Sequence, residues 1–455
     1  MKICVIGAGT YGSYVIDSLL SKYPNASIDL LDVGDASIKS ESQIGYFSSL
    51  KKEIYTGLTD GRFFGFGGAS VKWGGQLLTF SENDFANPDP FMQDVITLNK
   101  KHKKSMLKKF NIENNYPENP IAADLFTKTG VWLSVLNRNF FKIFKINKRK
   151  NVNVIPHCRV SRLFVDEKKA IQKVMYIENG IEKEAIYDYY FLTAGAFETA
   201  RILLSSELIK DKVSFSDHLS QKVFKIKKST VIGDEDYVFK MRGFSLITKR
   251  MIGEIDDCSF YAHPVFNMDF PFFQSLKTIV FKKQFTWEAI KGVFVNIPQI
   301  VAFLWSVLIK KRIFVLNNEW FLYIDIENPT MESFVTLSKE KDDFGLQGLD
   351  VYYNIGEDAE NVYKKSKELV EKHLKDKGVV YEVVAEKIEV RNSEDIYHPY
   401  GMYSDYKSVE EYFHKYDNLL VVSTGVLSRS GGINPTAALL PVIDEFVNVH
   451  FNYVK

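Results

Sequence analysis

Histidine and cysteine are the side chains best suited to proton transfer or metal binding, and this chain has eight histidines and three cysteines. His398 draws attention because it precedes Pro399 in the stretch Ile-Tyr-His-Pro-Tyr-Gly near the carboxyl end. A neutral imidazole can accept a proton near pH 7, so His398 is a candidate general base. A loop histidine that makes a structural hydrogen bond explains the same residues equally well.

The remaining histidines and the cysteines do not suggest a metal centre. The cysteines are widely spaced without a CxxC pair, and the histidines lack ligand spacing. We therefore expect no metal, no disulfide framework and a reducing, cytoplasmic location.

A glycine fingerprint at the amino terminus indicates a bound nucleotide. A five-residue apolar run leads into GAGTYG at residues 7–12, and an apolar-periodic segment follows, which gives the order strand, tight turn, helix. Gly7 allows the turn, Gly9 lets the backbone approach a pyrophosphate, and Gly12 lets the helix pack closely on the strand. The phosphate would lie on N–H groups at the positive end of the helix.

A second expected strand, residues 28–31, ends at Asp32. This acid lies at about the distance, roughly 20 residues, at which a carboxylate binds the adenosine ribose. The glycine fingerprint alone also fits an ordinary glycine-rich turn. The two strands and Asp32 together favour nucleotide binding.

The stretch from Gly61 to Gly75 has six glycines in fifteen residues, too many for a stable helix or strand. Ser70 and Trp73 add a hydroxyl and a flat apolar surface. A mobile surface loop is the alternative. Because Trp and Phe are poor linker residues, we favour a loop that lines a cofactor.

Two later segments repeat this pattern of a strand that ends in small residues. The expected strand 189–192 is followed by Thr-Ala-Gly-Ala at 193–196 and a helix-like run. The expected strand 418–422 is followed by Gly425 and by the stretch Gly-Gly-Ile-Asn-Pro-Thr at 431–436. The first of these is a second place where backbone could meet a cofactor.

Length and composition are those of a folded protein with two or three domains, with 455 residues, 45% hydrophobic and 25% charged. The net charge of +1 gives no global attraction to nucleic acid. We expect helices at 91–110, 122–137 and 357–375, and strands at 152–155, 160–165, 174–177, 223–232, 258–267, 319–326, 333–338 and 349–354.

Residues 292–309 carry no charge and precede Lys310-Lys311-Arg312. The segment barely reaches the length of a membrane span, and Pro298 weakens that interpretation further. We favour a buried helix of a substrate domain. The alternative is peripheral membrane contact through residues 292–312, with the basic cluster facing anionic lipid.

Taken together, these segments resemble the glucose–methanol–choline (GMC) oxidoreductase family. The matching stretches are GAGTYG, GFGGASVKWGG, TAGAFETARILLSS, ENPTMESFVTLS and the final HPYG, NLLVVSTG and GGINPTAAL. They occur in family order from residue 3 to about 445. The chain is shorter than most members, and it has no histidine before His102 for a covalent flavin link in the early glycine loop.

The resemblance implies an α/β fold with a Rossmann-type FAD-binding domain and a discontinuous α+β substrate domain built on an antiparallel sheet. Segments 1–86, 151–221 and 391–455 would form the first domain, and 87–150 and 222–390 the second. The residues implied at FAD are Gly7, Gly9, Thr10, Tyr11, Gly12, Asp32, Gly68, Ser70, Trp73, Val160, Ala194, Gly195, Gly425 and Asn434.

The implied activity is oxidation of a CH–OH group, of a sugar or polyol, by hydride transfer to flavin N5. His398 would be the general base, and Asn434 would orient the alcohol oxygen. Oxygen, a quinone or a protein is compatible as electron acceptor. The alternative is a membrane-peripheral flavoprotein, at the inner face of the membrane, that acts on a lipid-linked substrate. A non-catalytic flavin-binding protein is a third possibility.

Overall fold

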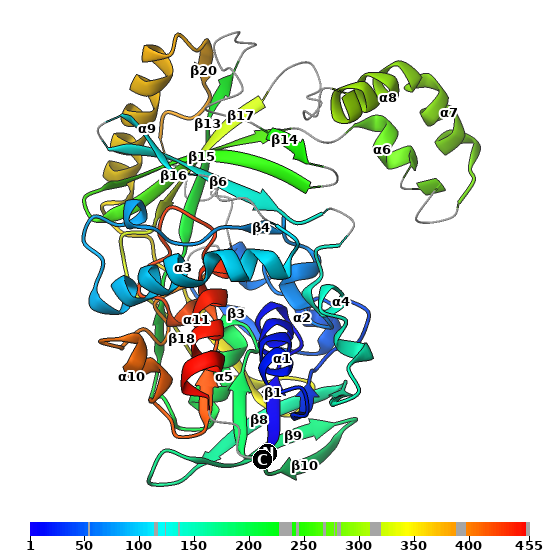
Figure 1. Cartoon of the computed structure of the whole chain (residues 1–455), viewed down its shortest axis with the longest axis vertical. Helices are drawn as coiled ribbons and strands as arrows, with labels where there is room; N and C mark the ends of the chain where they lie inside the picture. Colours follow the sequence, from blue (N-terminus) through cyan, green and yellow to red (C-terminus); the bar gives the residue numbers. More distant parts are fainter. Residues whose placement is uncertain are drawn as a thin grey trace.

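The computed structural model describes residues 1–52, 55–112, 117–122, 124–134, 137–226, 239–242, 245–266, 270–276, 278–279, 284–309, 320–387 and 397–451. Two parts are stacked along the long axis (Figure 1). One is built on a parallel sheet and holds both termini, and the other is built on a large antiparallel sheet.

The parallel sheet has the order β21-β11-β1-β2-β7. Its strands are β1 (Lys2–Ile6), β2 (Ser27–Leu31), β7 (Val152–Ile155), β11 (Tyr189–Leu192) and β21 (Leu419–Val421). Helices α1 (Thr10–Lys22) and α11 (Leu440–Glu445) pack beside it. The strands β1, β2 and β11 are mostly apolar and buried, as expected for strands covered on both faces. Their carboxyl ends meet, which brings Gly7, Asp32 and Thr193 to one edge.

The antiparallel sheet has the order β20-β13-β17-β16-β15-β6-β4, with β14 and β5 beside it. Its strands are β4 (Gln76–Leu77), β5 (Asn119–Ala122), β6 (Leu125–Trp132), β13 (His218–Ile226), β14 (Phe239–Arg242), β15 (Ser245–Ile255), β16 (Cys258–Phe266), β17 (Trp320–Glu327) and β20 (Tyr381–Val383). Helix α9 (Ala359–Asp376) packs on one face, against β15, β16 and β17.

Two smaller sheets complete the framework. One contains β8 (Cys158–Val165), β9 (Ile171–Glu178) and β10 (Ile181–Ala185), and the other has the order β12 (Val213–Phe215), β18 (Ser333–Lys341), β19 (Gln347–Tyr352) and β3 (Ser48–Leu50). The remaining α-helices are α2 (Glu41–Ile44), α3 (Pro90–Lys109), α4 (Phe140–Ile143), α5 (Ala196–Ser205), α6 (Pro271–Leu276), α7 (Trp287–Val295), α8 (Ile297–Leu304) and α10 (Val409–Phe413). The predicted α/β class, a Rossmann-type part joined to an antiparallel sheet, is confirmed.

Most expected elements are present, but the helix expected at 122–137 is wrong. This stretch contains strand β6, which pairs with β15 from Phe126↔Ile252 to Val131↔Ile247. Its β-branched residues Thr127, Thr129 and Val131 favour a strand, and tertiary pairing outweighs the helical pattern. The expected helices 91–110 and 357–375 correspond to α3 and α9. Of the strand expected at 223–232, residues 227–232 lie outside the described residues.

Contacts cross the domain segments expected from the sequence. Helix α3, from segment 87–150, packs against α11 in segment 391–455. Strands β18 and β19, from segment 222–390, share a sheet with β12 and β3. The division into 1–86, 151–221 and 391–455 against 87–150 and 222–390 stays a prediction.

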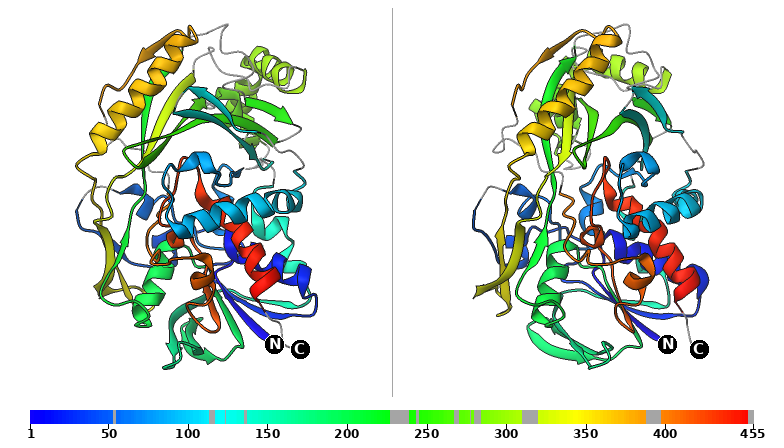
Figure 2. Two further views of the ribbon diagram at one scale, coloured as in Figure 1. Left: turned by 60° about the vertical axis from the view of Figure 1, so that its left-hand side comes forward. Right: turned by 90° about the vertical axis from the view of Figure 1, so that its left-hand side faces the viewer.

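The apolar segment 292–309 is not buried, so the prediction of a buried helix is wrong. Helices α6, α7 and α8 project from the antiparallel part (Figures 1 and 2). Within the described residues, no single helix is long and apolar enough to cross a membrane, whereas α7 and α8 together meet that criterion with a bend of 60° between them. The basic cluster Lys310-Lys311-Arg312 lies outside the described residues.

Candidate active site

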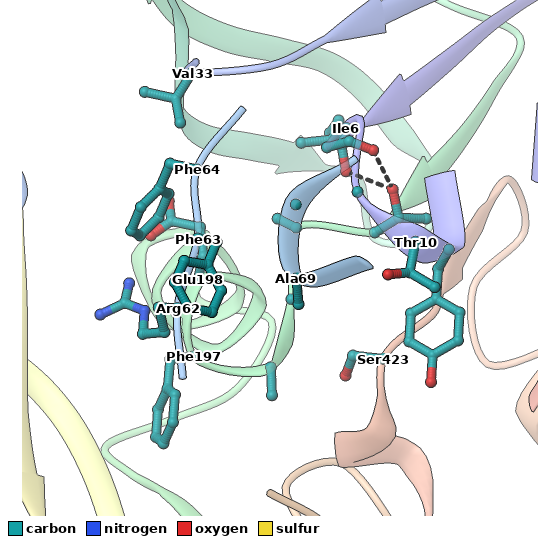
Figure 3. A pocket seen from close by; sticks show the side chains of 18 of the residues that line it. Ile6, Thr10, Val33, Arg62, Phe63, Phe64, Ala69, Phe197, Glu198 and Ser423 are labelled. Atoms are coloured by element: carbon teal, nitrogen blue, oxygen red, sulfur yellow. Dashed lines mark hydrogen bonds between the residues drawn. The ribbon is translucent and has the colours of Figure 1, made fainter. Parts of the chain in front are cut away.

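A cavity with about 1220 Å³ of empty space, part of it open to solvent, lies at the carboxyl ends of β1, β2 and β11. This edge is where parallel α/β sheets bind their ligands. Aromatic side chains Phe63, Phe64 and Phe197 lie on one side, and Ile6, Thr10 and Ser423 lie on the other (Figure 3). The cavity is therefore built from segments far apart in the chain.

Ten of the predicted site residues line this cavity. They are Gly7, Gly9, Thr10, Tyr11, Asp32, Gly68, Val160, Ala194, Gly195 and His398. The predicted residues Gly12, Ser70, Trp73, Gly425 and Asn434 are not among its lining residues.

The fingerprint glycines differ in the space around them. Gly7 has φ of +103°, which L side chains rarely adopt. A Cβ on Gly12 would lie 1.9 Å from the carbonyl oxygen of Gly7, so Gly12 permits close packing of helix on strand. A Cβ on Gly9 would instead find its nearest atom, Gly68 Cα, at 4.0 Å. The space beside Gly9 is therefore open toward the cavity.

Asp32 holds the turn through both of its carboxylate oxygens. Oδ2 accepts a hydrogen bond from the Ala8 N–H at 2.7 Å, and Oδ1 accepts one from the Gly34 N–H at 2.8 Å. Burial raises the pKa of Asp32, and these two hydrogen bonds oppose that rise. Each oxygen keeps a second lone pair, so the carboxylate can also accept a hydroxyl from the cavity.

Ser70 and Trp73 support the glycine-rich loop from behind. Ser70 Oγ donates to the Gly67 carbonyl at 2.6 Å and accepts from the Phe140 N–H at 3.1 Å. The Trp73 ring packs edge-on against Phe140, with centroids 5.4 Å apart. Their contacts fix the loop that carries Gly68 into the cavity.

Gly425 also lies behind the cavity wall. A Cβ there would meet Tyr403 at 2.7 Å and Met402 at 2.9 Å, so this position needs glycine for packing. Its neighbours Ser423 and Thr424 line the cavity instead.

His398 is held in place through its backbone by a buried carboxylate. The His398 N–H lies 3.1 and 3.2 Å from the two oxygens of Asp217, which also accepts from the Tyr55 hydroxyl at 2.7 Å and from the His218 N–H at 2.8 Å. Tyr397, just before His398, has φ of +59°. A non-glycine residue in this conformation stores local strain, which is common where a functional side chain must be aimed.

The environment of His398 favours the neutral imidazole. Burial, followed by electrostatic repulsion from His218 and Arg250, lowers the pKa of His398 to about 3, and Asp325 opposes this shift. Its Nδ1 has no hydrogen-bond partner among the described residues. His398 lines the cavity, and the fold holds its ring in the neutral form there.

His218 fixes the second segment of the site. Its Nε2 donates to the Gly431 carbonyl at 2.9 Å and lies 3.0 Å from Ser430 Oγ. Glu327 Oε1 accepts from the N–H groups of Ser430 and Gly431 at 2.9 and 2.8 Å. This turn leads to Asn434, whose buried Oδ1 is unpartnered in the described part of the chain. Asp217 contacts the segment of His398, and His218 contacts the segment that leads to Asn434. These two adjacent residues therefore hold the two segments close to each other.

The sequence did not assign a site role to Asp217 or His218, and it did not predict the aromatic wall of Phe63, Phe64 and Phe197. No spacing motif marks these residues. The cluster of phenylalanines beside Gly65 is the sequence feature that could have predicted this aromatic wall.

Glu198 also lines the cavity, but it belongs to a buried ionic network. It pairs with Arg159 at 2.5 Å and with Arg201 at 2.8 Å, and Arg159 also pairs with Asp342 at 2.8 Å. The pKa of Glu198 is lowered because these cations outweigh the effect of burial. Glu198 therefore stabilises the cavity wall through these ion pairs.

Away from the cavity, Glu410, His414 and His450 place three metal-ligating atoms within 4.8 Å of one another. Glu410 and His414 are exposed, and His450 is half-buried. The arrangement is a surface ion-pair cluster.

Two solved structures share this fold over nearly the whole chain. Pyridoxine 4-oxidase from Mesorbium loti aligns with a TM-score of 0.56 and 13% identity, covering 99% of each chain. A formate oxidase from Aspergillus oryzae RIB40, solved as a variant to study FAD modification, aligns with a TM-score of 0.51 and 10% identity, covering 98% of this chain and 97% of the other. No family model and no curated protein matches the sequence. At such identities the comparison establishes the fold that the chain shares with these two oxidases.

Proposed function

We propose that this protein is an FAD-dependent oxidoreductase that oxidises a CH–OH group, with a sugar or polyol as substrate class. The observation that carries the proposal is that His398, from the carboxyl-terminal part, lines the same cavity as the glycine fingerprint from the amino terminus. The likeness to two oxidases, one of them studied for FAD modification, supports the same conclusion.

The residues present fit a dinucleotide. Added Cβ atoms at Gly9 and Gly195 would meet open space, and both glycines line the cavity. No side chain caps the first turn of α1, so its N–H groups are available to a pyrophosphate. Asp32 offers lone pairs to a ribose hydroxyl.

Bound FAD would supply a hydride acceptor beside the substrate carbon. In the proposed reaction, the neutral ring of His398, which lines the cavity, accepts the hydroxyl proton. Asn434, whose buried Oδ1 has no hydrogen-bond partner among the described residues, orients the alcohol. Asp217 keeps the imidazole in place through the backbone.

The test is anaerobic flavin reduction by candidate alcohols, followed by the loss of visible absorbance. His398→Ala should retain bound flavin, while its rate of reduction falls by about 10² or more. His414→Ala is the matched control, because this exposed histidine lies outside the cavity. Unchanged reduction in His398→Ala would reject the role of His398, and protein that binds no FAD would reject the function.

A second candidate is a peripheral membrane flavoprotein that acts on a lipid-linked substrate at the inner face of the membrane and passes electrons to a quinone or protein. The exposed apolar surface of α7 and α8 favours it. The following side chains are all exposed by 45% or more: Phe285, Trp287, Phe294, Val295, Ile297, Val301, Leu304, Trp305, Leu308 and Ile309. So many exposed large apolar side chains within one short segment are unusual for a protein surrounded only by water.

The charge of this region is complementary to anionic lipid. Between residues 270 and 312 the sequence has seven lysines or arginines and one glutamate. Tryptophan beside basic residues is typical of helices that lie in a membrane interface. Membrane binding is thus the property that separates this candidate from an enzyme free in solution.

A further inference from the structure

One face of the antiparallel sheet is polar and turns toward the candidate active site. Directly paired residues of antiparallel strands lie on the same face. The pairs on this face include Arg250↔Lys128, Ile252↔Tyr261, Tyr261↔Asp325, Ser220↔Asp325 and His218↔Glu327. The contact of His218 with Gly431 shows that this face meets the segment that carries Asn434. The other face is apolar and packs against α9.

Most charges on the polar face are neutralised. On this face, Lys128 pairs with Asp84 and Glu118, and Arg429, from the loop that meets the face, pairs with Glu327 and Glu254.

Arg250 differs from these cations. It is only 6% exposed, and no carboxylate of the described residues lies within ion-pair distance of it. Its Nη2 donates to Gln76 Oε1, and its guanidinium carbon lies 4.5 Å from the centre of the Tyr261 ring. Nε and Nη1 have no hydrogen-bond partner in the described part of the chain.

A buried guanidinium with unpartnered donors is costly unless an anion completes its shell. Burial lowers the pKa of Arg250, in line with this cost. A neutral amide such as Gln76 supplies one acceptor but no negative charge. The side chain is therefore poised to bind an anionic oxygen group.

Arg250 also lies within electrostatic range of the proposed general base. The Tyr261 ring that it covers is 5.5 Å from the His218 ring, and His218 bonds to Gly431. Its positive charge is one of the two that lower the pKa of His398. An anion bound at Arg250 would remove that charge effect and make His398 a stronger base.

We propose that Arg250 binds an anionic oxygen group, a carboxylate or a phosphate, on the alcohol that His398 deprotonates. This inference rests on the proposed function and narrows its substrate class to hydroxyl compounds that carry an oxyanion, such as sugar acids or sugar phosphates. Gln76 and Tyr261 act as positioning residues for the guanidinium.

The test is a titration of the purified flavin-loaded protein with sodium acetate and with inorganic phosphate, with sodium chloride at matched ionic strength as reference. Binding is measured by calorimetry and by the change in the visible flavin spectrum. We expect saturable binding of at least one oxyanion, and an affinity about ten-fold or more weaker in Arg250→Met. Acetate binding identifies a carboxylate, and phosphate binding identifies a phosphate group.

Two further variants keep the test decisive. Arg250→Lys retains the charge and should restore part of the affinity if Arg250→Met folds poorly. Lys249→Met removes a charge from the neighbouring residue, whose side chain points to the other face, and should leave binding unchanged. The measured oxyanion should also compete with the alcohol that reduces the flavin.

The inference is overturned if neither oxyanion binds more tightly than chloride, or if Arg250→Met binds as well as the parent. Calorimetry reads anion binding without turnover, so this failure is separate from a failure of the proposed function. Reduction by neutral alcohols with no anion binding would leave the oxidoreductase proposal standing and reject the role of Arg250.

Discussion

At the scale of single residues, one buried dipeptide connects the two halves of the site. The Asp217 carboxylate anchors the backbone of His398, while the His218 ring anchors the turn that precedes Asn434. Both residues are fully buried. A small shift of either would move one proposed catalytic group relative to the other, so their packing controls the geometry of the reaction.

The lowered pKa of His398 predicts a pH dependence of stability. In the unfolded chain a histidine has a pKa near 6.5, and in the folded protein that of His398 is about 3. Between these values the unfolded state binds more protons, so stability falls as the pH falls. From pH 6.5 to 4.5 this residue should account for about 2 kcal/mol of lost stability.

Thermal or denaturant unfolding as a function of pH measures this effect. His398→Gln should show a shallower loss of stability over that window than the parent, and the exposed His414→Gln serves as control. Equal slopes in His398→Gln and the parent would show that the imidazole of His398 is not kept neutral by the fold.

At the scale of elements, the turn between β1 and α1 separates two uses of glycine. Gly12 has no room for a Cβ because the Gly7 carbonyl lies against it, whereas Gly9 faces open space. Glycine is needed for folding at Gly12 and for the approach of a ligand at Gly9.

This difference predicts opposite outcomes for two alanine substitutions. Gly9→Ala should change unfolding free energy by about 0.5 kcal/mol or less and weaken FAD binding by about ten-fold or more. Gly12→Ala should destabilise the protein by about 1–3 kcal/mol because the Cβ overlaps backbone. Melting temperature and flavin absorbance of both variants check this. Full flavin content in Gly9→Ala would contradict close approach of the cofactor at this turn.

The antiparallel sheet shows a similar division between its two faces. Ala262 and Ile324 lie on the face that packs against α9, while Tyr261 and Asp325 lie on the face toward the site. Because side chains alternate along a strand, one register sets both faces. A slip of one residue would exchange the polar wall of the site with the apolar core.

At the scale of the whole molecule, the site and the exposed helices lie in different places. The cavity lies at the strand ends of the parallel-sheet part. Helices α6, α7 and α8 project from the antiparallel part (Figures 1 and 2). If the substrate is carried by a membrane, the antiparallel part is the part of the protein that would contact that membrane, because it bears the exposed apolar side chains.

Flotation with vesicles tests the membrane interaction. The parent should float with vesicles that contain phosphatidylglycerol and less with pure phosphatidylcholine, since the region has an excess of basic residues. A triple variant, Phe294→Ser, Val301→Ser and Leu308→Ser, should lose most of the binding because it removes exposed apolar area.

The control is Ile181→Ser with Ile186→Ser, which removes two exposed apolar residues elsewhere on the surface and should leave flotation unchanged. Absence of flotation, together with a change of oligomeric state in the triple variant, would assign the surface to a second copy of the chain and reject the membrane candidate.

The sequence by itself determined the nucleotide fingerprint, most strands and the α/β class. These depend on local signals: Gly7, Gly9 and Gly12 occur within six residues, and strand or helix periodicity is read over short windows. Ten of the predicted site residues, including His398, line one cavity, and their roles stay predictions.

Only the tertiary structure decided which distant residues face one another. The contacts of Asp217, His218 and Arg250 depend on sheet register and on the segments that pack against the sheet, and no local pattern encodes either. The exposure of residues 292–309 was likewise invisible, because an apolar helix has the same sequence whether it packs in a core or projects from it. Burial is a property of the surroundings, and the surroundings come from the whole chain.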